Sequence, residues 1–378
     1  MERILITGGT GFVGTRLCEV LMLTERWNPR VFVHSTASAT RIARFPVDLV
    51  FGDLLDKESV NRAIEGCDAV VHLARGNSQV TTKGLENLLQ ATLKQRCARF
   101  VHLSSVAVYG NHPPPESVVE EAPPRPGDMA YGVEKLKQEQ HVRRYGRIHG
   151  LPFVILRPPN IYGPFSQFTM SLIDKIRKAE MPIVDSGQNP CNLVYVDNLI
   201  EAILLSLWKQ DGVRETFFVT DLETLSWERC LNDHAALLRT TLPRVSRDVL
   251  VAKPQERLIW DSLRLMPSVF FSDEIRSQFR KLPLIKFVET ALYEKFQGLP
   301  TEIQQRLRVT ITGPQSFQKN EALLLKSFRA DDPLIAAQGR TVAHSSDKAK
   351  RLLGYSAPVS YCQGMALTAN WLRYARLL

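Results

Sequence analysis

The run RILITGGTGFVG at residues 3–14 decides the expected fold. Its first five residues are mostly apolar or β-branched and predict a buried strand, and the pattern at 15–22 predicts an amphipathic helix. The glycines between them predict a tight turn: Gly8 lets the chain turn, Gly11 lets backbone approach a pyrophosphate, and Gly14 lets helix and strand pack closely. Because this turn directly follows a buried strand, it predicts a dinucleotide-binding unit.

Three further strand patterns follow at 48–51, 69–73 and 99–103, separated by helical patterns at 57–65 and 80–96. Strands that alternate with helices favour parallel pairing with right-handed crossovers. The predicted fold is therefore α/β, a Rossmann-type doubly wound parallel sheet with helices on both faces.

The rest of the chain predicts a smaller, mostly helical C-terminal substrate lobe. We assign 1–158 to the Rossmann domain, with 193–222 returning to it, and 159–192 and 223–378 to the lobe. Within the lobe, residues 239–335 combine helical patterns with a basic excess.

The positive charge of the chain is concentrated in this part of the lobe. Of the formal net charge of +9, residues 239–326 plus Arg329 carry 16 basic and 9 acidic residues, a local charge of +7. We interpret the segment as a helical cap with a solvated basic face. The alternative is a basic amphipathic surface that makes peripheral contact with a membrane. We expect no nucleic-acid partner.

Polar residues after the next strand bear on the choice of cofactor. The strand at 31–33 leads into His34, Ser35 and Thr36, with Arg41 following, and no acidic residue stands there to bind a ribose 2′-hydroxyl. Hydroxyls and a guanidinium suit a 2′-phosphate, which favours NADP over NAD; the alternative is an exposed loop that accepts either cofactor. Asp53 is expected to reach the adenine amino group, or else to serve as a turn residue.

Tyr131, Lys135 and Ser105 are the candidate catalytic residues. Tyr131 and Lys135 lie four apart in a predicted helix at 130–148, so their side chains share one face. A neighbouring ammonium stabilises a phenolate and brings the tyrosine pKa toward neutrality, which makes Tyr131 a candidate general acid/base. Ser105, at the end of a strand, is expected to hydrogen-bond the same substrate oxygen. This chemistry needs no metal.

The sequence resembles the extended short-chain dehydrogenase/reductases, the NAD(P)-dependent epimerase/dehydratase group, over about residues 1–230 and 340–378. The matching motifs are TGGTGFVG at 7–14, GDL at 52–54, HLA at 72–74, LSS at 103–105, YGVEK at 131–135 and RPPNIYGP at 157–164.

The resemblance implies roles for further residues. Lys135 would bind the nicotinamide ribose, Pro158 and Ile161 would border the nicotinamide, and Asn160 would face the substrate or serve as a turn residue. It also implies a homodimer through the helices at about 80–97 and 130–149. The full set expected to contact the cofactor is Gly8, Thr10, Gly11, Phe12, Val13, Gly14, Ser35, Arg41, Asp53, Leu54, Leu73, Ala74, Tyr131, Lys135, Pro158 and Ile161.

At several positions the sequence departs from the family pattern, and these departures limit the reactions that the protein could catalyse. Val106 and Ala107 stand where dehydratases carry an Asp-Glu pair, and neither side chain can move a proton, which disfavours dehydration. Cys191-Asn192 stands where nucleotide-sugar enzymes usually present an arginine that grips the diphosphate. Asp197-Asn198 resembles the family's Asp-Asp helix start, for which we expect a capping role.

Two reactions remain, and both begin with hydride transfer. The leading hypothesis is an NAD(P)-dependent sugar epimerase or related sugar-modifying oxidoreductase that works through a transient ketone, with a nucleotide sugar as the small-molecule substrate. The alternative is an alcohol dehydrogenase or ketoreductase acting on a hydrophobic, sterol- or polyketide-like hydroxyl compound.

Composition excludes several other classes. With 44% hydrophobic and 23% charged residues the chain is globular, and it contains neither an apolar run long enough to span a membrane nor a signal-peptide pattern. Its six cysteines are scattered without a C-x-x-C pair, which disfavours a zinc site or a disulfide framework. We expect a cytoplasmic protein.

Overall fold

The computed structural model describes residues 2–25, 27–250 and 328–378 of the chain. It divides into two compact units, Met1–Arg247 with Asp332–Leu378, and Asp248–Asp331. Most of the second unit lies outside the described residues, and so does most of the basic segment 239–335 for which helices are predicted. The features described here belong to the first unit.

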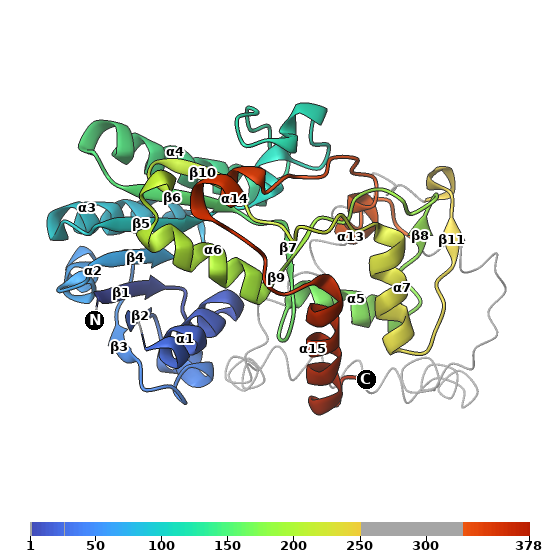
Figure 1. Cartoon of the computed structure of the whole chain (residues 1–378), viewed down its shortest axis with the longest axis horizontal. Coiled ribbons are helices and arrows are strands. Elements are labelled where there is room, and N and C mark those ends of the chain that lie inside the picture. The colour runs from blue at the N-terminus through green and yellow to red at the C-terminus, as the bar shows by residue number, and fades with distance from the viewer. Residues whose placement is uncertain (1, 26, 251–327) are drawn as a thin grey trace, which may run out of the picture. The chain divides into compact units, whose positions relative to one another are not determined.

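A seven-stranded parallel sheet forms the centre of this unit, in the order β10-β6-β5-β4-β1-β2-β3 (Figure 1). The chain builds outward from β1 to one edge and then from β4 to the other, which is the doubly wound topology predicted from the sequence. The strands are β1 (Glu2–Thr7), β2 (Trp27–Val33), β3 (Asp48–Phe51), β4 (Ala69–His72), β5 (Arg99–Leu103), β6 (Phe153–Arg157) and β10 (Glu215–Phe218).

Helices cover both faces of the sheet because alternate strand residues point to opposite sides. On one face Ile4 and Ile6 pack with residues of α1 (Phe12–Thr24) and α6 (Val196–Trp208). On the other face Leu5 packs with residues of three helices. These are α2 (Lys57–Ile64), α3 (Leu85–Gln95), which a π-helical turn at Val80–Gly84 precedes, and α4 (Ala130–His149).

The remaining elements form the smaller, mostly helical part. Two short parallel pairs, β7 with β9 and β8 with β11, join these helices. One helix, α14, packs against α6 and β10, so the end of the chain returns to the large sheet. The elements are β7 (Asn160–Tyr162), α5 (Gln167–Arg177), β8 (Ile183–Val184), β9 (Leu193–Tyr195), α7 (Trp227–Leu237), β11 (Arg244–Val245), α13 (Pro333–Ala337), α14 (Asp347–Leu353) and α15 (Tyr361–Tyr374).

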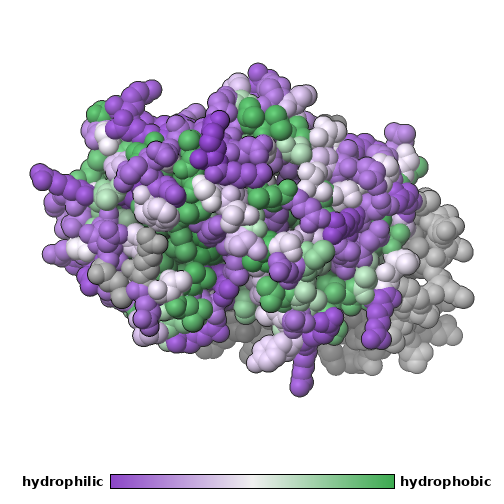
Figure 2. Space-filling model, in the orientation of Figure 1, coloured by the Kyte–Doolittle hydropathy of each residue, from purple (hydrophilic) through white to green (hydrophobic). Residues whose placement is uncertain are grey.

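The visible surface of the described residues is mostly hydrophilic, with apolar patches between the polar side chains (Figure 2). Within the described ranges, no helix is both long enough and apolar enough to cross a membrane. Five of the six cysteines are buried, and all six are free thiols.

The predicted capping role of Asp197 is wrong. The N-cap of α6 is Tyr195, and its side chain makes no capping hydrogen bond. The Asp197 carboxylate instead accepts two hydrogen bonds from Arg16 of α1, at 2.6 Å from Nε and 2.8 Å from Nη2. Two charge-assisted hydrogen bonds from a guanidinium stabilise the carboxylate more than one backbone N–H at the helix terminus would, so tertiary pairing overrides the local preference.

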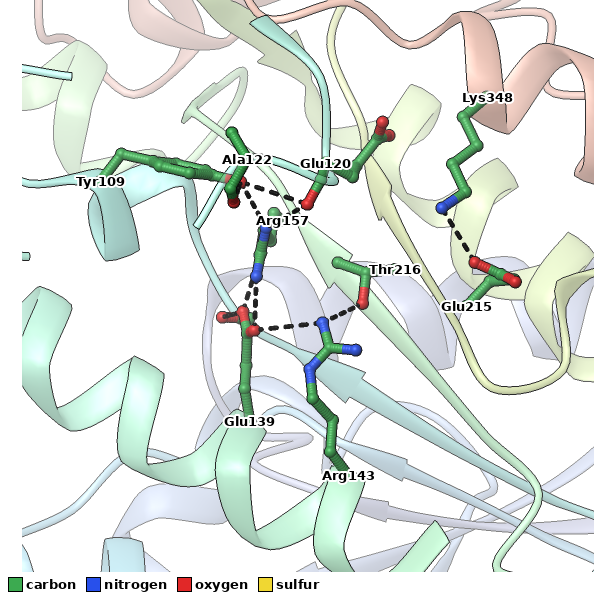
Figure 3. Close-up of polar contacts among 10 residues, drawn as sticks. Tyr109, Glu120, Ala122, Glu139, Arg143, Arg157, Glu215, Thr216 and Lys348 are labelled. Atoms are coloured by element: carbon green, nitrogen blue, oxygen red, sulfur yellow. Dashed lines mark hydrogen bonds and ion pairs between the residues drawn. The ribbon is translucent and has the colours of Figure 1, made fainter. Parts of the chain in front are cut away.

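A buried ion pair joins the central strands to α4 (Figure 3). Arg157, at the end of β6, donates from Nε and Nη2 to the two carboxylate oxygens of Glu139, at 2.8 and 2.7 Å, and each side chain is only 1% exposed. Ser104, just after β5, donates to the same carboxylate at 2.6 Å, and Arg157 Nη1 donates to Tyr109 Oη at 2.6 Å. Each buried charge therefore has hydrogen-bonded partners, as burial of a charge requires.

Two further cations, one on α4 and one on α14, bind side chains of the edge strand β10. Arg143 of α4 donates to Thr216 Oγ1 at 2.5 Å and lies 3.5 Å from Glu139 (Figure 3). Lys348 of α14 lies 2.8 Å from the Glu215 carboxylate. Both helices are thereby attached to the strand that ends the sheet.

We predict that Glu139→Gln lowers the free energy of unfolding by about 3–5 kcal/mol, because Arg157 then keeps a buried charge without its counter-ion. Urea denaturation followed by circular dichroism measures the change. The control is Asp174→Asn, which breaks the exposed Asp174–Lys178 pair and should leave the midpoint unchanged. Equal midpoints for both variants would contradict a stabilising role for the buried pair.

Candidate active site

The turn between β1 and α1 requires glycine at two positions. Gly8 has a φ of +74°, and a Cβ there would lie 2.6 Å from the backbone nitrogen of Ala74. A Cβ at Gly14 would lie 2.3 Å from the carbonyl oxygen of Gly8. Only glycine lets the turn pass beside the end of β4 and lets α1 pack onto the turn.

The N-terminus of α1 offers free backbone donors. Its N-cap is Gly11, no side chain caps it, and its first turn carries no acidic residue. The unpaired N–H groups and the helix dipole at such a terminus favour a phosphate.

A cavity of about 620 Å³ lies at the carboxyl ends of β1, β2 and β4. This position, beside the switch in strand order between β1 and β4, is where doubly wound folds bind dinucleotides. The predicted cofactor residues that line the cavity are Gly8, Thr10, Gly11, Ser35, Asp53, Leu54, Leu73 and Ala74. The cavity and the open helix terminus together fit a dinucleotide and define a dinucleotide-binding protein.

Several other predicted cofactor residues are not in the lining of this cavity. Val13 belongs to the apolar core, and Gly14 packs against the turn. Phe12 and Arg41 line a separate cavity of about 470 Å³, in which the Arg41 guanidinium lies 5.3 Å from the centre of the Phe165 ring. The structure therefore does not bring Arg41 together with Ser35.

The end of β2 presents hydroxyls and an imidazole to the cavity. His34, Ser35 and Ser38 line it there. Ser35 Oγ accepts a hydrogen bond from the Ser38 backbone at 3.4 Å, so this serine also caps a short 3₁₀ turn.

Asp53 is held rigidly at the cavity wall. Its Oδ1 accepts from the Leu55 backbone at 2.9 Å, while its own backbone N–H and C=O both bond the Ser59 hydroxyl. Asp53 therefore has the turn role considered for it and also lines the cavity.

The three candidate catalytic residues come from β5 and α4. Ser105 follows β5, and its hydroxyl donates to the Pro158 carbonyl at 3.4 Å and accepts from the Ala107 backbone at 3.2 Å. The Nζ of Lys135 lies 6.0 Å from the centre of the Tyr131 ring, as expected for neighbours on one helix face. Lys135 is 7% exposed and donates to the Leu103 carbonyl at 2.7 Å.

The electrostatics differ from what the Tyr-x-x-x-Lys spacing predicts. Burial raises the pKa of Tyr131, and the positive charge of Arg75 and a hydrogen bond with Ser105 offset this only in part. Burial and then Arg75 lower the pKa of Lys135 to about 8, against the raising effect of Glu139. The structure does not show the expected lowering of the tyrosine pKa by Lys135, because burial dominates and the positive charge that acts on Tyr131 is that of Arg75.

Sequence reasoning missed Arg75. It follows Ala74, lines the dinucleotide cavity, and places its guanidinium carbon 4.8 Å from the centre of the Tyr131 ring. The sequence could have indicated it, because Arg75 directly follows HLA at 72–74. That position is just after the carboxyl end of a parallel strand, where such sheets present functional side chains.

The predicted substrate-facing elements lie on a separate short sheet. Asn160 and Ile161 belong to β7, which pairs with β9, and the Ile161 carbonyl accepts from Ser166 Oγ at 2.7 Å. Pro158 is linked to Ser105 as described, and its carbonyl also accepts from the Val106 backbone at 3.1 Å. Asn160 is half-buried.

Nucleotide-sugar enzymes usually have a diphosphate-binding arginine at the position where this chain has Cys191 and Asn192. Both residues are held in the structure. Cys191 is buried. The Asn192 side chain donates to the Val342 carbonyl at 2.8 Å and accepts from the His344 backbone at 3.0 Å. Its amide is thus committed to holding the segment that leads into α14.

The region after Ser105 offers no acid for dehydration. Residues Val106–Tyr109 form a 3₁₀ turn, and the only hydroxyl among them, on Tyr109, is buried and hydrogen-bonded to Arg157. Among the described parts of the chain, no group of three or more His, Cys, Asp or Glu side chains could hold a metal ion.

Comparisons with known proteins identify the family of the chain. The NAD dependent epimerase/dehydratase family matches residues 4–219. A 4-hydroxy-2-methyl-3-oxo-4-farnesyl-3,4-dihydroquinoline-1-oxide ketoreductase of Stigmatella aurantiaca is 30% identical over 230 residues, 58% of this chain and 68% of that protein. The dTDP-glucose 4,6-dehydratase of Streptomyces niveus is 28% identical over 235 residues, 54% of this chain and 68% of that one.

A solved structure shows the same fold. The UDP-glucose 4-epimerase of Thermotoga maritima with UDP-glucose aligns with a TM-score of 0.65 and 18% identity over 99% of each chain. From the family match, the chain belongs to the NAD-dependent epimerase/dehydratase family, whose members are enzymes of the extended short-chain dehydrogenase/reductase class.

We predict that Gly14→Ala weakens cofactor binding at least tenfold and lowers stability by about 1–3 kcal/mol, since its Cβ would overlap the Gly8 carbonyl. Calorimetric titration with NADP and thermal denaturation measure the two effects. The control is Gly127→Ala, at a glycine with no atom within 4 Å of a built Cβ. Its φ of +58° carries a small strain cost, but cofactor binding should be unchanged. Unaltered cofactor affinity in Gly14→Ala would contradict the assignment of this turn.

Proposed function

We propose that the protein catalyses reversible hydride transfer between NAD(P) and a secondary alcohol or ketone, with Tyr131 as the acid/base. The observation that carries this proposal is the place of Tyr131: it lies beside Lys135 on α4 and beneath Arg75, which lines the dinucleotide cavity.

In the proposed reaction a bound nicotinamide supplies the hydride that reaches the carbonyl carbon. Tyr131 gives its phenolic proton to the carbonyl oxygen, so that the ketone becomes a secondary alcohol, and Tyr131 then regains a proton from solvent. The Ser105 hydroxyl, once it turns from the Pro158 carbonyl, donates a hydrogen bond to the same oxygen and stabilises the charge that develops there. The Leu103 carbonyl holds the Lys135 side chain beside the Tyr131 ring.

Under this proposal the turn and helix terminus bind the pyrophosphate through backbone amides. Asp53 reaches the adenine amino group from the cavity wall. Lys135 binds the nicotinamide ribose, as the family resemblance implies. The residues proposed to surround the rest of the cofactor are Thr10, Leu54, Leu73, Ala74, Pro158 and Ile161. Phe12 and Val13 take part only through their backbone N–H groups at the start of α1.

Net reduction of a ketone is the outcome that the site favours, which reverses the order of the two hypotheses drawn from the sequence. Asn192 stands in place of the diphosphate-binding arginine and is committed to main-chain partners. The ketoreductase of Stigmatella aurantiaca, one of the two relatives reported above, has a hydrophobic substrate by its name. A hydrophobic hydroxyl or keto compound is therefore the proposed substrate.

Epimerisation of a nucleotide sugar is the second candidate, because a UDP-glucose 4-epimerase shares the fold over nearly its full length. Cofactor stoichiometry separates the two. A reductase consumes one reduced nicotinamide for each product, whereas an epimerase changes the sugar with no net change in nicotinamide absorbance.

We also propose a cytoplasmic homodimer in which α3 and α4, which pack against each other, form the contact. Free, buried thiols suit a reducing compartment. Gel filtration with light scattering tests the dimer. The alternative of membrane contact through 239–335 falls mainly on residues outside the described part of the chain.

We predict that Tyr131→Phe lowers kcat by about 10²–10⁴-fold, because the substrate oxygen loses its proton donor. Cofactor affinity should change little, and nicotinamide absorbance measures the rate. The control is Tyr374→Phe, at a tyrosine that is 90% exposed near the C-terminus, which should keep full activity. Unchanged turnover in Tyr131→Phe would overturn the proposed acid/base.

We further propose NADP as the preferred cofactor, since the described residues that line the cavity after β2 are His34, Ser35 and Ser38, none of them acidic. Ser35→Asp is expected to weaken NADP binding at least tenfold through repulsion of the 2′-phosphate and to strengthen NAD binding. Fluorescence titration with both cofactors gives the ratio of affinities, with Ser35→Asn as the uncharged control. Tighter binding of NAD by the unaltered protein would contradict the preference.

A further inference from the structure

Arg75 is a cation in the candidate active site, and the proposed reaction assigns it no role. Its guanidinium carbon lies 4.8 Å from the centre of the Tyr131 ring, and the residue lines the dinucleotide cavity. It is exposed. Within residues 2–25, 27–250 and 328–378, it has neither an ion pair nor a side-chain hydrogen bond.

The charges around Tyr131 are unbalanced. Arg75 and Lys135 both face the ring, at 4.8 and 6.0 Å. The acidic groups that act on Tyr131 and Lys135 are both on α4: Glu134, which is half-buried, and Glu139, which is paired with Arg157. The side of the ring that Arg75 covers therefore presents a guanidinium whose donors are available.

We propose that Arg75 binds a carboxylate of the substrate, so that the substrate is an oxo or hydroxy acid whose carboxylate lies close to the reacting carbon. This inference rests on the proposed function and specifies its substrate class. A guanidinium offers paired N–H donors that match the two oxygens of a carboxylate. Its position over Tyr131 would hold that carboxylate beside the carbonyl that the tyrosine protonates.

Two other roles for Arg75, binding of the cofactor pyrophosphate and support of the Tyr131 phenolate, predict different results. The cofactor pyrophosphate already has the open N-terminus of α1, where Gly11 leaves the backbone donors uncapped. A role confined to supporting the Tyr131 phenolate would affect acids and esters alike. Selectivity for the acid is therefore the distinguishing property.

The test compares matched ligand pairs on the full-length protein saturated with NADP. The probes are 2-oxooctanoate and 3-oxooctanoate with their methyl esters, and binding is measured calorimetrically. At least one acid should bind about 10- to 100-fold more tightly than its ester, the effect of a charge-assisted pair. Arg75→Gln should abolish this difference, and Arg75→Lys should retain part of it. Arg62→Gln, which removes an exposed arginine on α2, is the matched control.

Several results would overturn the carboxylate assignment. Equal binding of acid and ester, no binding of either, or acid selectivity that survives Arg75→Gln would each do so. Loss of NADP affinity in Arg75→Gln by the same factor would assign Arg75 to the cofactor. Arg75-dependent binding of UDP-glucose, without binding of the oxo acids, would assign the anion to a diphosphate.

The outcome is separable from the proposed function. Ketone turnover that needs Tyr131 but shows no preference for the acid would reject the carboxylate site and keep the reaction. Acid-selective binding that needs Arg75, in a protein with no hydride transfer, would keep the carboxylate site and reject the reaction. Tyr131→Phe should retain acid binding in the same assay, because the guanidinium remains in place.

Discussion

The buried pair between Arg157 and Glu139 is the constraint on which the site depends. It joins the end of β6 to α4, and through Ser104 it also reaches the end of β5. Because both charges are removed from water, each must keep its partner in hydrogen-bonding geometry, so α4 cannot rotate freely against the strands. Lys135 lies one helical turn before Glu139 and Ser105 directly follows Ser104, which means that the same contact holds two of the three candidate catalytic residues.

Around Tyr131, burial and charge act in opposite directions. Desolvation raises the tyrosine pKa and lowers that of Lys135 to about 8, so burial opposes ionisation of both side chains. A negative group brought near Lys135 would favour its ammonium form. The glycine turn places the helix donors, the dinucleotide cavity and Arg75 at one edge of the sheet, where cofactor and substrate would meet the tyrosine.

Much of this arrangement could be predicted from local patterns. The strands at 48–51 and 99–103 have the predicted bounds, and the helix of Tyr131 and Lys135 differs by one residue. Other features depend on residues distant in sequence. Asp197 looked like a cap but pairs with Arg16, 181 positions earlier. Arg41 was expected beside Ser35, yet the 3₁₀ turn between them directs it toward Phe165.

The amino-acid sequence by itself determined the doubly wound sheet, the glycine turn and the four-residue spacing that makes Tyr131 and Lys135 neighbours on one helix. These follow from periodicity, backbone freedom and short spacings, which act over a few residues. Tertiary structure alone decided which charges are buried and which cation covers the Tyr131 ring. It also decided that the Asn192 side chain is hydrogen-bonded to the segment before α14. The reason is physical: desolvation and charge pairing depend on which groups meet in space, and no local pattern encodes that meeting.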